Sequence, residues 1–404
     1  MSKIITDEKQ IDEILERGVI VEILPTKKEF KQKLMSGERL RFYIGADPTA
    51  KSLHLGHAQN LIILESFRRL GHEVIFLIGD FTGMIGDPSE KSSTRVKQTR
   101  QEVEENFKNW KDQVKNILNF NDKENPVKIE YNSKWLSKLN FSEVLELASN
   151  FTVQQMLERD MFEKRLQEGK PIYLHEFLYP LMQGYDSVVM NVDVEMCGTD
   201  QTFNALAGRT LMQKIKNKDK FVVVNGLIAD EKTGLLMSKS NGTGVFLNLS
   251  AKDLFGAIMA QSDGMMRPLM LGCTRFPLKE IERLMQLENP KDAKMALAFE
   301  ITKNFHGEKL AVQAREDFEN KFSKKETPID APEMIVAEGD NLINKIIKEA
   351  LAESKGNAKR KIKQGGVSLN GEKILAVDYK FTKIDDGKIL KVGKKDFRKV
   401  KIEK

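Results

Sequence analysis

The chain has 404 residues, of which 40% are hydrophobic and 31% charged, and a formal net charge of +6; this composition is typical of a globular protein of two or three domains. The apolar runs, such as residues 74–79, are far shorter than the roughly 20 residues that a membrane span requires, and we expect no secretory signal because the N-terminus is acidic. The only two cysteines, Cys197 and Cys273, have no metal-binding spacing, which favours the reducing cytoplasm and argues against a structural zinc site.

The first predicted elements form a strand–helix–strand unit. Residues 42–46 are an apolar run typical of a buried strand, and apolar positions recur at helical spacing over 55–70. Residues 74–78 form a second apolar run, followed by a turn-rich stretch over 82–88 that we interpret as a loop. This order predicts a parallel sheet, in which ligands bind along the edge formed by the carboxyl ends of the strands.

The middle of the chain predicts helices and then further strands. Residues 96–190 are mostly helical in pattern, with a short strand near 127–131, and we interpret them as a helical insertion. The sheet is expected to resume with strands at 192–196 and 221–224, joined by a helix over 201–214.

Residues 251–322 show helical periodicity without a strand pattern, and therefore predict a separate helical domain. Together the patterns predict an α/β fold: a Rossmann-like parallel-sheet catalytic domain with a helical insertion, an α-helical domain, and a small α+β domain. The expected bounds are 1–245 for the catalytic domain with its insertion around 96–190, 246–325 for the helical domain, 326–340 for a charged, proline-containing linker, and 341–404 for the last domain.

The segment His54-Leu55-Gly56-His57 lies where the first strand meets its helix. His54 and His57 share the first helical turn, so both can donate hydrogen bonds to one phosphate, and Gly56 removes a side chain where a nucleotide must lie close. A lone histidine is usually a satisfied core residue. Here two of the chain's five histidines stand beside a glycine at a strand-to-helix junction, and this arrangement favours a functional role.

A second motif supplies positive charge. Leu236-Met237-Ser238-Lys239-Ser240 is flanked by glycines, so it can form a loop that closes over a ligand, with Lys239 facing a leaving pyrophosphate; a solvated surface loop is the alternative. Lys91 and Arg95 are four residues apart and would either hold phosphates or form an ordinary ion-paired helix face. With the histidines, these cations predict an enzyme that activates a carboxylate with ATP, since that transition state needs aimed donors and positive charge.

In this order the motifs resemble those of the class I aminoacyl-tRNA synthetases, and in particular the bacterial-type tyrosyl-tRNA synthetases. The first motif reads Tyr43-Ile44-Gly45-Ala46-Asp47-Pro48-Thr49-Ala50-Lys51-Ser52-Leu53-His54-Leu55-Gly56-His57, and the resemblance extends from there to the C-terminus. It implies that tyrosine and ATP give tyrosyl-adenylate and pyrophosphate, and that the tyrosyl group is then transferred to tRNA(Tyr).

The resemblance also implies a tyrosine pocket. Tyr43 and Asp186 would bind the phenolic hydroxyl, with Asp186 accepting its proton. This arrangement selects against phenylalanine, and tyrosyl-tRNA synthetases are themselves the familiar instance of such discrimination. The resemblance assigns the substrate ammonium and the remaining tyrosine contacts to Asp87, Tyr179, Gln183 and Gln201.

On the nucleotide side, Gly198 would allow the sugar to approach and Asp200 would accept from a ribose hydroxyl, or Asp200 could be a helix N-cap. The resemblance implies a catalytic set of His54, His57, Lys239 and Thr49, and an ATP and pyrophosphate set of Gly56, Lys91, Arg95, Gly198, Asp200, Met237, Ser238 and Ser240. Two positions depart from the family pattern: Leu236 stands where a lysine is common, for which Lys232 is a candidate substitute, and Cys197 where a glycine is common.

The C-terminal segment is strongly basic. Residues 341–404 contain 18 Lys and Arg against 8 Asp and Glu, so their net charge is +10. Because the whole chain has a net charge of +6, the other 340 residues have a net charge of −4. A basic helix, the Gly365-Gly366 turn, a short strand and the Asn370-Gly371 turn resemble an S4-type RNA-binding domain. The phosphate contacts would come from Lys359, Arg360, Lys361 and Lys363. A solubilising basic tail is the alternative.

The resemblance further implies ATP with Mg²⁺ as a substrate complex, no protein-bound metal, a cytoplasmic homodimer without membrane association, and tyrosine and tRNA(Tyr) as the other substrates. One alternative is a tryptophan-type synthetase, against which Tyr43, Asp186 and the S4-like tail argue. The other is a non-catalytic RNA-binding protein on a synthetase scaffold, which would not need His54, His57 or Lys239.

Overall fold

The computed structural model describes residues 3–87, 98–238, 242–323, 331–393 and 396–403. Contacts within the chain divide it into two compact units, Met1–Glu316 and Asp317–Lys404. None of the helices described is long and apolar enough to cross a membrane.

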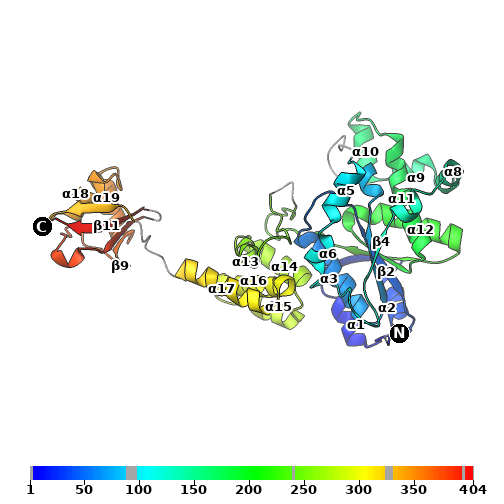
Figure 1. The fold of residues 1–404 in the computed structure, drawn as a ribbon, viewed down its shortest axis with the longest axis horizontal. Helices are drawn as coiled ribbons and strands as arrows, with labels where there is room; N and C mark the ends of the chain where they lie inside the picture. The colour runs from blue at the N-terminus through cyan, green and yellow to red at the C-terminus, as the bar shows by residue number, and fades with distance from the viewer. Residues whose placement is uncertain (1–2, 88–97, 239–241, 324–330, 394–395, 404) are drawn as a thin grey trace. The chain divides into compact units, whose positions relative to one another are not determined.

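A six-stranded sheet forms the centre of the first unit (Figure 1), with the strand order β1-β6-β5-β2-β3-β4. The strands are β1 Ile20–Leu24, β2 Arg41–Ala46, β3 Glu73–Ile78, β4 Lys128–Tyr131, β5 Val194–Gly198 and β6 Phe221–Asn225. All neighbours pair in parallel except β1 and β6, which are antiparallel. From β2 the chain builds outward through β3 to β4, and then returns to build through β5 and β6 on the other side. The switch point between β2 and β5 is where open α/β sheets bind ligands.

The predicted parallel sheet is confirmed. Strand β2, helix α3 (Leu55–Arg69) and strand β3 form the expected βαβ unit, and β5, α12 (Thr202–Lys216) and β6 form the resumed half. Strand β3 is buried from Val74 to Ile78, as is typical of a parallel strand covered on both faces.

Three features differ from the sequence-based expectation. The stretch predicted as a loop over 82–88 begins with a short helix, α4 (Thr82–Ile85). Strand β4 lies inside the predicted helical insertion, but it extends the main sheet beside β3. Strand β1 was not predicted.

The remaining helices cover the sheet and continue the first unit beyond it (Figure 1). Those before β5 are α1 Glu8–Leu15, α2 Lys27–Met35, α5 Arg100–Phe107, α6 Trp110–Val114, α7 Ser133–Leu136, α8 Phe141–Ala148, α9 Val153–Leu157, α10 Asp160–Gln167 and α11 Leu174–Met190. After β6 the described elements are helical, as predicted: α13 Ala251–Met259, α14 Met266–Cys273, α15 Leu278–Met285, α16 Pro290–His306 and α17 Glu308–Ser323.

Two glycines allow α11 and α12 to pack closely under the switch point. A Cβ atom on Gly184 of α11 would lie 3.1 Å from the backbone nitrogen of Gly208 on α12. A Cβ on Gly208 would lie 2.5 Å from Lys220 Nζ, closer than real side chains approach. Glycine at 184 therefore allows the close helix contact, and glycine at 208 leaves room for the ammonium group of Lys220.

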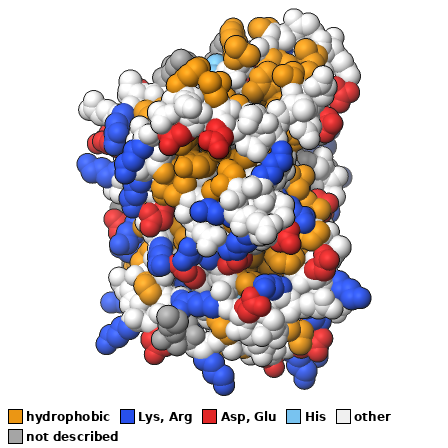
Figure 2. Space-filling model, turned by 90° about the vertical axis from the view of Figure 1, so that its right-hand side faces the viewer, with side chains coloured by type: hydrophobic (Ala, Val, Ile, Leu, Met, Phe, Trp, Pro, Cys, Tyr) orange, Lys and Arg blue, Asp and Glu red, His pale blue; other side chains and the backbone are white. Residues whose placement is uncertain are grey.

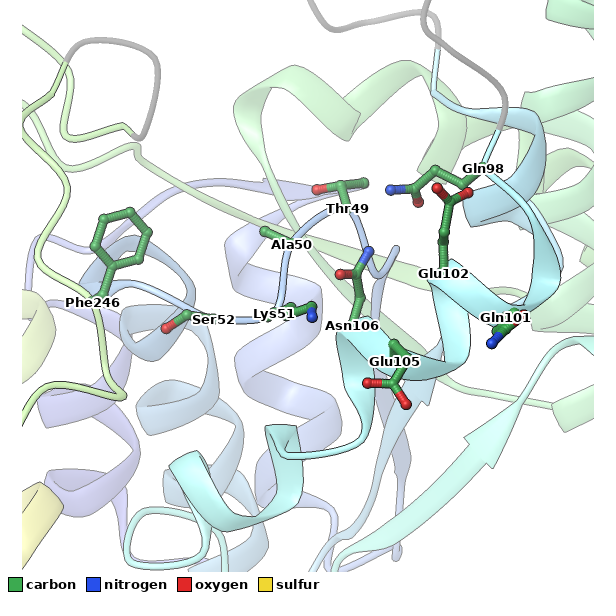
Figure 3. Close-up of a pocket in the computed structure, with 10 residues that line it drawn as sticks. All are labelled: Thr49, Ala50, Lys51, Ser52, Gln98, Gln101, Glu102, Glu105, Asn106 and Phe246. Carbon is green, nitrogen blue, oxygen red and sulfur yellow. The ribbon is translucent and has the colours of Figure 1, made fainter.

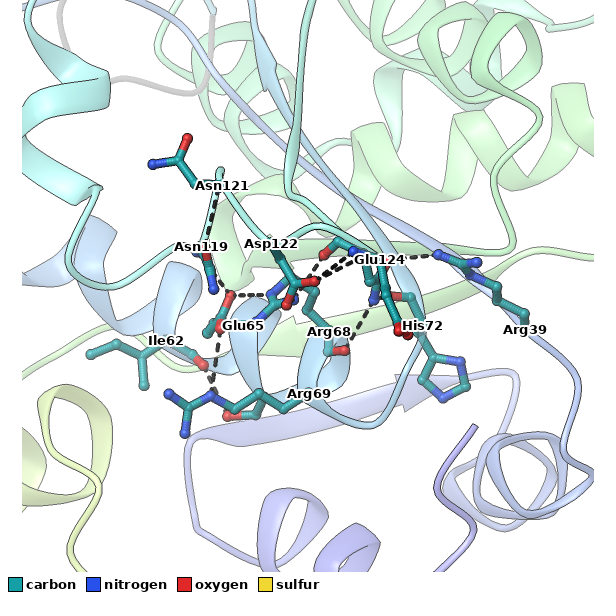
Figure 4. A network of polar contacts seen from close by, with 12 residues as sticks. Arg39, Ile62, Glu65, Arg68, Arg69, His72, Asn119, Asn121, Asp122 and Glu124 are labelled. Atoms are coloured by element: carbon teal, nitrogen blue, oxygen red, sulfur yellow. Dashed lines mark hydrogen bonds and ion pairs between the residues drawn. The ribbon is translucent and has the colours of Figure 1, made fainter. Parts of the chain in front are cut away.

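A buried ion-pair network fixes the end of α3 to the segment that leads into β4 (Figure 4). Both oxygens of Glu65 accept from the Arg68 guanidinium, each at 2.8 Å, and the two side chains are almost fully buried. Arg68 also donates to Asp122 Oδ2 at 2.9 Å. Because a bidentate arginine–carboxylate pair has a defined geometry, this network sets the approach of β4 to the sheet edge.

The second unit has a separate core and a five-stranded sheet of order β7-β11-β10-β8-β9. Its elements are β7 Glu333–Val336, α18 Leu342–Lys348, α19 Lys355–Lys363, β8 Val367–Leu369, β9 Glu372–Lys373, β10 Ile389–Val392 and β11 Asp396–Ile402. Asn370 and Gly371 connect β8 to β9 with φ angles of 46° and 90°, the left-handed pair that two-residue hairpin turns favour. Strand β7 falls within the range expected to be a linker, but it pairs in parallel with β11 and so belongs to this sheet.

Candidate active site

The two histidines of the first motif are arranged by the backbone at the start of α3. His54 is the N-cap residue, and its Nδ1 accepts from the backbone N–H of Gly56 at 3.1 Å. His57 Nδ1 accepts from the backbone N–H of His54 at 3.2 Å. Since Nδ1 is an acceptor in both rings, each neutral imidazole carries its hydrogen on Nε2. The two Nε2–H groups are then the donors available to a ligand.

Burial keeps these imidazoles uncharged. It lowers the pKa of His54 to about 4, and burial together with the nearby His54 lowers the pKa of His57 to about 3. Both rings are therefore neutral donors at pH 7, rather than cations. Gly56 is required by the same geometry, because a Cβ there would lie 2.8 Å from Cε1 of His54.

The segment after the lysine motif returns to these histidines. The backbone N–H of Leu55 donates to the carbonyl of Val245 at 2.9 Å, and that of Leu247 donates to Leu53 at 2.8 Å. The ring of Phe246 packs edge-on against His54, with 6.4 Å between ring centroids. The segment that follows the lysine motif is thus adjacent to the histidine motif in the fold.

The two sides of the lysine loop are joined by Thr243. Its Oγ1 donates to the carbonyl of Leu236 at 2.8 Å and accepts from the backbone N–H of Ser238 at 3.1 Å. Met237 is buried. The other predicted residues of this group, Lys239, Ser240, Lys91 and Arg95, lie outside the described residues, so their predicted roles stay predictions.

Thr49 lines a cavity of about 600 Å³ beside the histidine motif (Figure 3). Its lining comes from the loop after β2, from the segment leading into α5, from α5 itself and from Phe246: Thr49, Ala50, Lys51, Ser52, Gln98, Gln101, Glu102, Glu105, Asn106 and Phe246. Asn106 holds the loop by donating to the carbonyl of Pro48 at 2.8 Å. The structure describes all the predicted tyrosine-binding residues, and none of them lines this cavity.

Gly198 and Asp200 lie at the carboxyl end of β5, on the other side of the switch point. Asp200 is exposed and makes no side-chain capping bond to α12 or to the short 3₁₀ helix Thr199–Gln201. The N-cap alternative for Asp200 is therefore not supported. A Cβ on Gly198 would lie 2.6 Å from Asp200 Oδ1, so the glycine leaves room for this carboxylate.

Asp186 on α11 is a buried carboxyl group held by two donors that the sequence did not reveal. Trp135 Nε1 donates to Oδ1 at 2.7 Å, and Asn132 Nδ2 donates to Oδ2 at 3.3 Å. Burial raises the pKa of Asp186 well above its usual range, while these two hydrogen bonds oppose that rise.

Tyr179 is also on α11, but its hydroxyl is engaged by a residue outside the predicted set. It donates to Asp47 Oδ2 at 2.7 Å, and Thr82 Oγ1 donates to Asp47 Oδ1 at 2.6 Å. Burial and the neighbouring Asp47 raise the pKa of Tyr179 well above its usual value, so the hydroxyl remains a donor. Asp47 follows β2 directly, and its position at a strand end was the signal that could have identified it.

Asp87 and Gln201, two of the predicted tyrosine-binding residues, are hydrogen-bonded to each other. Gln201 Nε2 donates to Asp87 Oδ2 at 2.5 Å, and the buried Arg159 donates to Asp87 Oδ1 at 3.2 Å. Arg159 was not predicted, because nothing in the local sequence connects the start of α10 to this carboxylate.

Tyr43 of β2 lies beside Ser187 and Glu195 rather than in direct contact with Asp186. Its hydroxyl is 3.1 Å from Ser187 Oγ, and Glu195 is its register partner on β5. Burial raises the pKa of Tyr43 well above its usual value. Gln183 Nε2 donates to Glu195 Oε1 at 2.8 Å.

The predicted RNA-binding residues of the C-terminal module all lie on α19 in the second unit. Lys359, Arg360 and Lys363 are exposed, whereas Lys361 donates to the carbonyl of Leu351 at 2.8 Å. Lys361 thus has a structural partner as well as a predicted RNA contact.

Comparisons with known proteins agree with this architecture. The family model for class I tRNA synthetases (W and Y) matches residues 35–323, and that for the tyrosine–tRNA ligase SYY-like C-terminal domain matches residues 317–400. A tyrosine–tRNA ligase of Thermotoga maritima is 40% identical over 401 residues, covering 98% of each chain. That of Haemophilus influenzae is 41% identical over 398 residues, covering 97% of this chain and 95% of its own.

Solved structures give the same result. A C-terminally truncated mitochondrial tyrosyl-tRNA synthetase of Coccidioides posadasii superposes with a TM-score of 0.63 at 26% identity, covering 76% of this chain and 91% of its own. A tyrosyl-tRNA synthetase of Archaeoglobus fulgidus in complex with L-tyrosine shares the fold, with a TM-score of 0.58 at 18% identity, covering 76% of this chain and 99% of its own. The chain therefore belongs to the class I tRNA synthetases for tryptophan and tyrosine, and within them to the tyrosine–tRNA ligases.

Proposed function

We propose that this tyrosine–tRNA ligase activates its amino acid through neutral histidine donors at one end of the switch point and a buried carboxyl-lined pocket at the other. A carboxylate oxygen of tyrosine attacks the α-phosphorus of ATP, the bond from that phosphorus to the bridging oxygen breaks, and pyrophosphate leaves. A ribose hydroxyl at the end of tRNA(Tyr) then attacks the acyl carbon, and AMP leaves. Mg²⁺ accompanies ATP as part of the substrate complex.

The arrangement of His54 and His57 carries this proposal. Their Nε2–H groups stand at the N-terminus of α3, where the helix dipole also favours anions. Neutral donors fixed in advance stabilise the charge that develops at phosphorus without reorganising during the reaction. Thr49 and Lys239 are proposed to reach the phosphates of ATP, Lys91 and Arg95 to bind the leaving pyrophosphate, and Asp200 to accept from the ribose.

The tyrosine end of the site is proposed to be built on α11. Asp186 and Tyr43 would bind the phenolic hydroxyl, while Asp87, Gln183 and Gln201 would hold the ammonium group and backbone of the substrate. The observed bond from Tyr179 to Asp47 supports a shared role for these two residues near that ammonium. Polar groups at the pocket end disfavour tryptophan, whose indole ring lacks a hydroxyl.

The second unit is proposed to bind tRNA through an S4-like surface. Lys359, Arg360 and Lys363 are exposed on one basic helix, which suits contact with phosphates rather than with bases. Charge-removing variants should therefore weaken tRNA binding and reduce its salt dependence, and leave adenylate formation unchanged.

We also propose a homodimer. Helices α8 to α11 and the segments between them expose large apolar side chains, and Figure 2 shows hydrophobic side chains gathered on the face that includes this region. The exposed residues are Phe141, Leu145, Val153, Leu166, Tyr173 and Leu174. Such a surface is typical of an interface, and sedimentation of the purified protein tests it.

ATP–pyrophosphate exchange, measured with one amino acid at a time, tests the proposed reaction. Exchange with tyrosine alone is expected. Exchange with tryptophan instead would keep the mechanism and overturn the pocket assignment. No exchange with any amino acid would favour the non-catalytic alternative.

A further inference from the structure

A buried ion pair lies behind the proposed tyrosine pocket, among residues that have no assigned role in substrate binding. Lys220 immediately precedes β6 and Glu195 lies on β5, and their side chains are 0% and 2% exposed. Such a pair loses much of its attraction to the cost of desolvation, and apolar residues of similar size are often as stable. Stability alone is therefore a weak reason for placing it here.

Ser187 connects this ion pair to Tyr43. Lys220 Nζ donates to Ser187 Oγ at 3.0 Å, and that oxygen is 3.1 Å from the hydroxyl of Tyr43 and 3.4 Å from Glu195 Oε2. An ammonium group has no lone pair, so Ser187 must accept from Lys220. Its single hydroxyl hydrogen goes to the carboxylate of Glu195, so Ser187 also accepts from the hydroxyl of Tyr43.

We propose that Lys220 is a positioning residue which, through Ser187, fixes the direction of the hydrogen bond made by Tyr43 and so contributes to selection of tyrosine. Because Ser187 accepts from Tyr43, the hydrogen of Tyr43 is held by the protein, and its oxygen is left to face the phenolic hydroxyl of the substrate. Asp186, which two protein donors hold in place, is the other group proposed at the phenolic hydroxyl. This inference rests on the proposed function, since it requires tyrosine as the substrate.

The other carboxylate oxygen of the pair acts on a second pocket residue. Glu195 Oε1 accepts from the amide nitrogen of Gln183 at 2.8 Å. The amide oxygen of Gln183 is then the atom available to a donor, and the ammonium group of an amino acid is a donor. One buried ion pair thus determines which atoms of Tyr43 and Gln183 are left to donate or accept hydrogen bonds. These are the residues proposed to bind the phenolic end and the ammonium end of the substrate.

The packing of α12 makes room for this arrangement. A Cβ on Gly208 would lie 2.5 Å from Lys220 Nζ and 3.1 Å from Ser187 Oγ. Only a glycine at this point of the helix leaves the ammonium group its place between Ser187 and Glu195.

Two variants test the proposal by ATP–pyrophosphate exchange, with kcat and KM measured for tyrosine, phenylalanine and ATP. Ser187→Ala keeps the ion pair but breaks its link to Tyr43. We expect the ratio of kcat/KM for tyrosine to kcat/KM for phenylalanine to fall about tenfold or more. This is the effect of losing one hydrogen bond that is linked to charged groups. The KM for ATP should not change.

The double variant Lys220→Met/Glu195→Gln removes both charges at similar volume, so that no unpaired charge is buried. We expect the same loss of preference and a further rise in the KM for tyrosine, because Gln183 loses its anionic partner. Lys216→Met, on the exposed side of α12, is the matched control and should behave as wild type.

The outcomes separate the inference from the proposed function. If the folded variants keep the wild-type preference for tyrosine and lose only thermal stability, the ion pair is structural and the inference is overturned. If the wild-type protein shows no tyrosine-dependent exchange, the proposed function itself fails, and the inference fails with it.

Discussion

At the residue scale, the histidines of the first motif are neutral donors with a defined tautomer. Because both Nδ1 atoms accept backbone N–H groups, NMR of ¹⁵N-labelled histidine should find Nδ1 unprotonated and Nε2 protonated at pH 7. The midpoints of titration should lie near 4 for His54 and near 3 for His57 in the free protein. Midpoints near 6.5, assigned with His54→Gln and His57→Gln, would contradict neutral donors.

The donors to Asp186 are a second residue-scale feature. Trp135→Phe removes the shorter of its two hydrogen bonds while keeping an aromatic ring in place. The carboxylate form then loses a stabilising partner, so the KM for tyrosine should rise about tenfold. The KM for ATP serves as the internal control and should stay constant. An unchanged KM for tyrosine would show that Trp135 has no part in the pocket.

The residues of the motifs could be predicted from sequence, but their partners could not. Strand ends and helix starts indicated His54 and Asp200, because chemistry in α/β folds gathers at those points, whereas Asp186, inside α11, came from the family resemblance. Asn132, Trp135, Glu195 and Lys220 reach α11 from other elements, across 8 to 54 residues of sequence, and Ser187 of α11 meets Tyr43 across 144 residues. Such contacts depend on tertiary packing, of which the local sequence carries no pattern.

At the element scale, the packing of α12 against Lys220 depends on the absence of a side chain at Gly208. Gly208→Ala would place a Cβ against Lys220 Nζ, and overpacking of this kind costs about 1–3 kcal/mol. The control is Gly256→Ala in α13, where no atom lies within 4 Å of the new Cβ. That change should be neutral or stabilising by up to about 1 kcal/mol, because glycine is a poor helix former. Equal effects in urea unfolding would contradict this difference.

Periodicity predicted the main elements for a clear physical reason. Buried parallel strands such as β3 are continuous apolar runs, and α3 and α12 have one apolar face. Strand β1 lacks such a run, since Val21 and Glu22 are exposed at the sheet edge. Helix α4 was missed because its glycines indicated a turn, whereas Asn132 fixes its start by accepting from the backbone N–H of Phe81 at 2.9 Å.

At the scale of the whole molecule, buried neutral histidines connect stability to pH. Burial lowers the pKa of His72 to about 4, and this residue lies beside the network shown in Figure 4. Between about pH 6.5 and pH 4 the unfolded chain binds a proton at this position that the folded chain does not. Stability therefore falls as pH falls through this range, by about 2 kcal/mol from pH 6.5 to pH 5 for one such histidine.

The slope of stability against pH isolates this contribution. His72→Gln should lower the stability at pH 7 and flatten the dependence between pH 6.5 and pH 5, since glutamine does not titrate. His175→Gln, at a histidine exposed to solvent, should leave the slope as in wild type. Parallel slopes for wild type and His72→Gln would contradict a buried neutral imidazole.

The separation of roles along the switch point is tested most directly by single-turnover formation of tyrosyl-adenylate in His54→Ala, because glutamine would keep an N–H donor near the position of Nε2. The Nε2–H donor is lost at the phosphate end, while the tyrosine pocket is untouched. The rate should fall about 100-fold, as for removal of one donor from a developing anion, with the Kd for tyrosine unchanged. An unchanged rate, or an equal loss in rate and in tyrosine affinity, would contradict the assignment of the histidine to transition-state stabilisation.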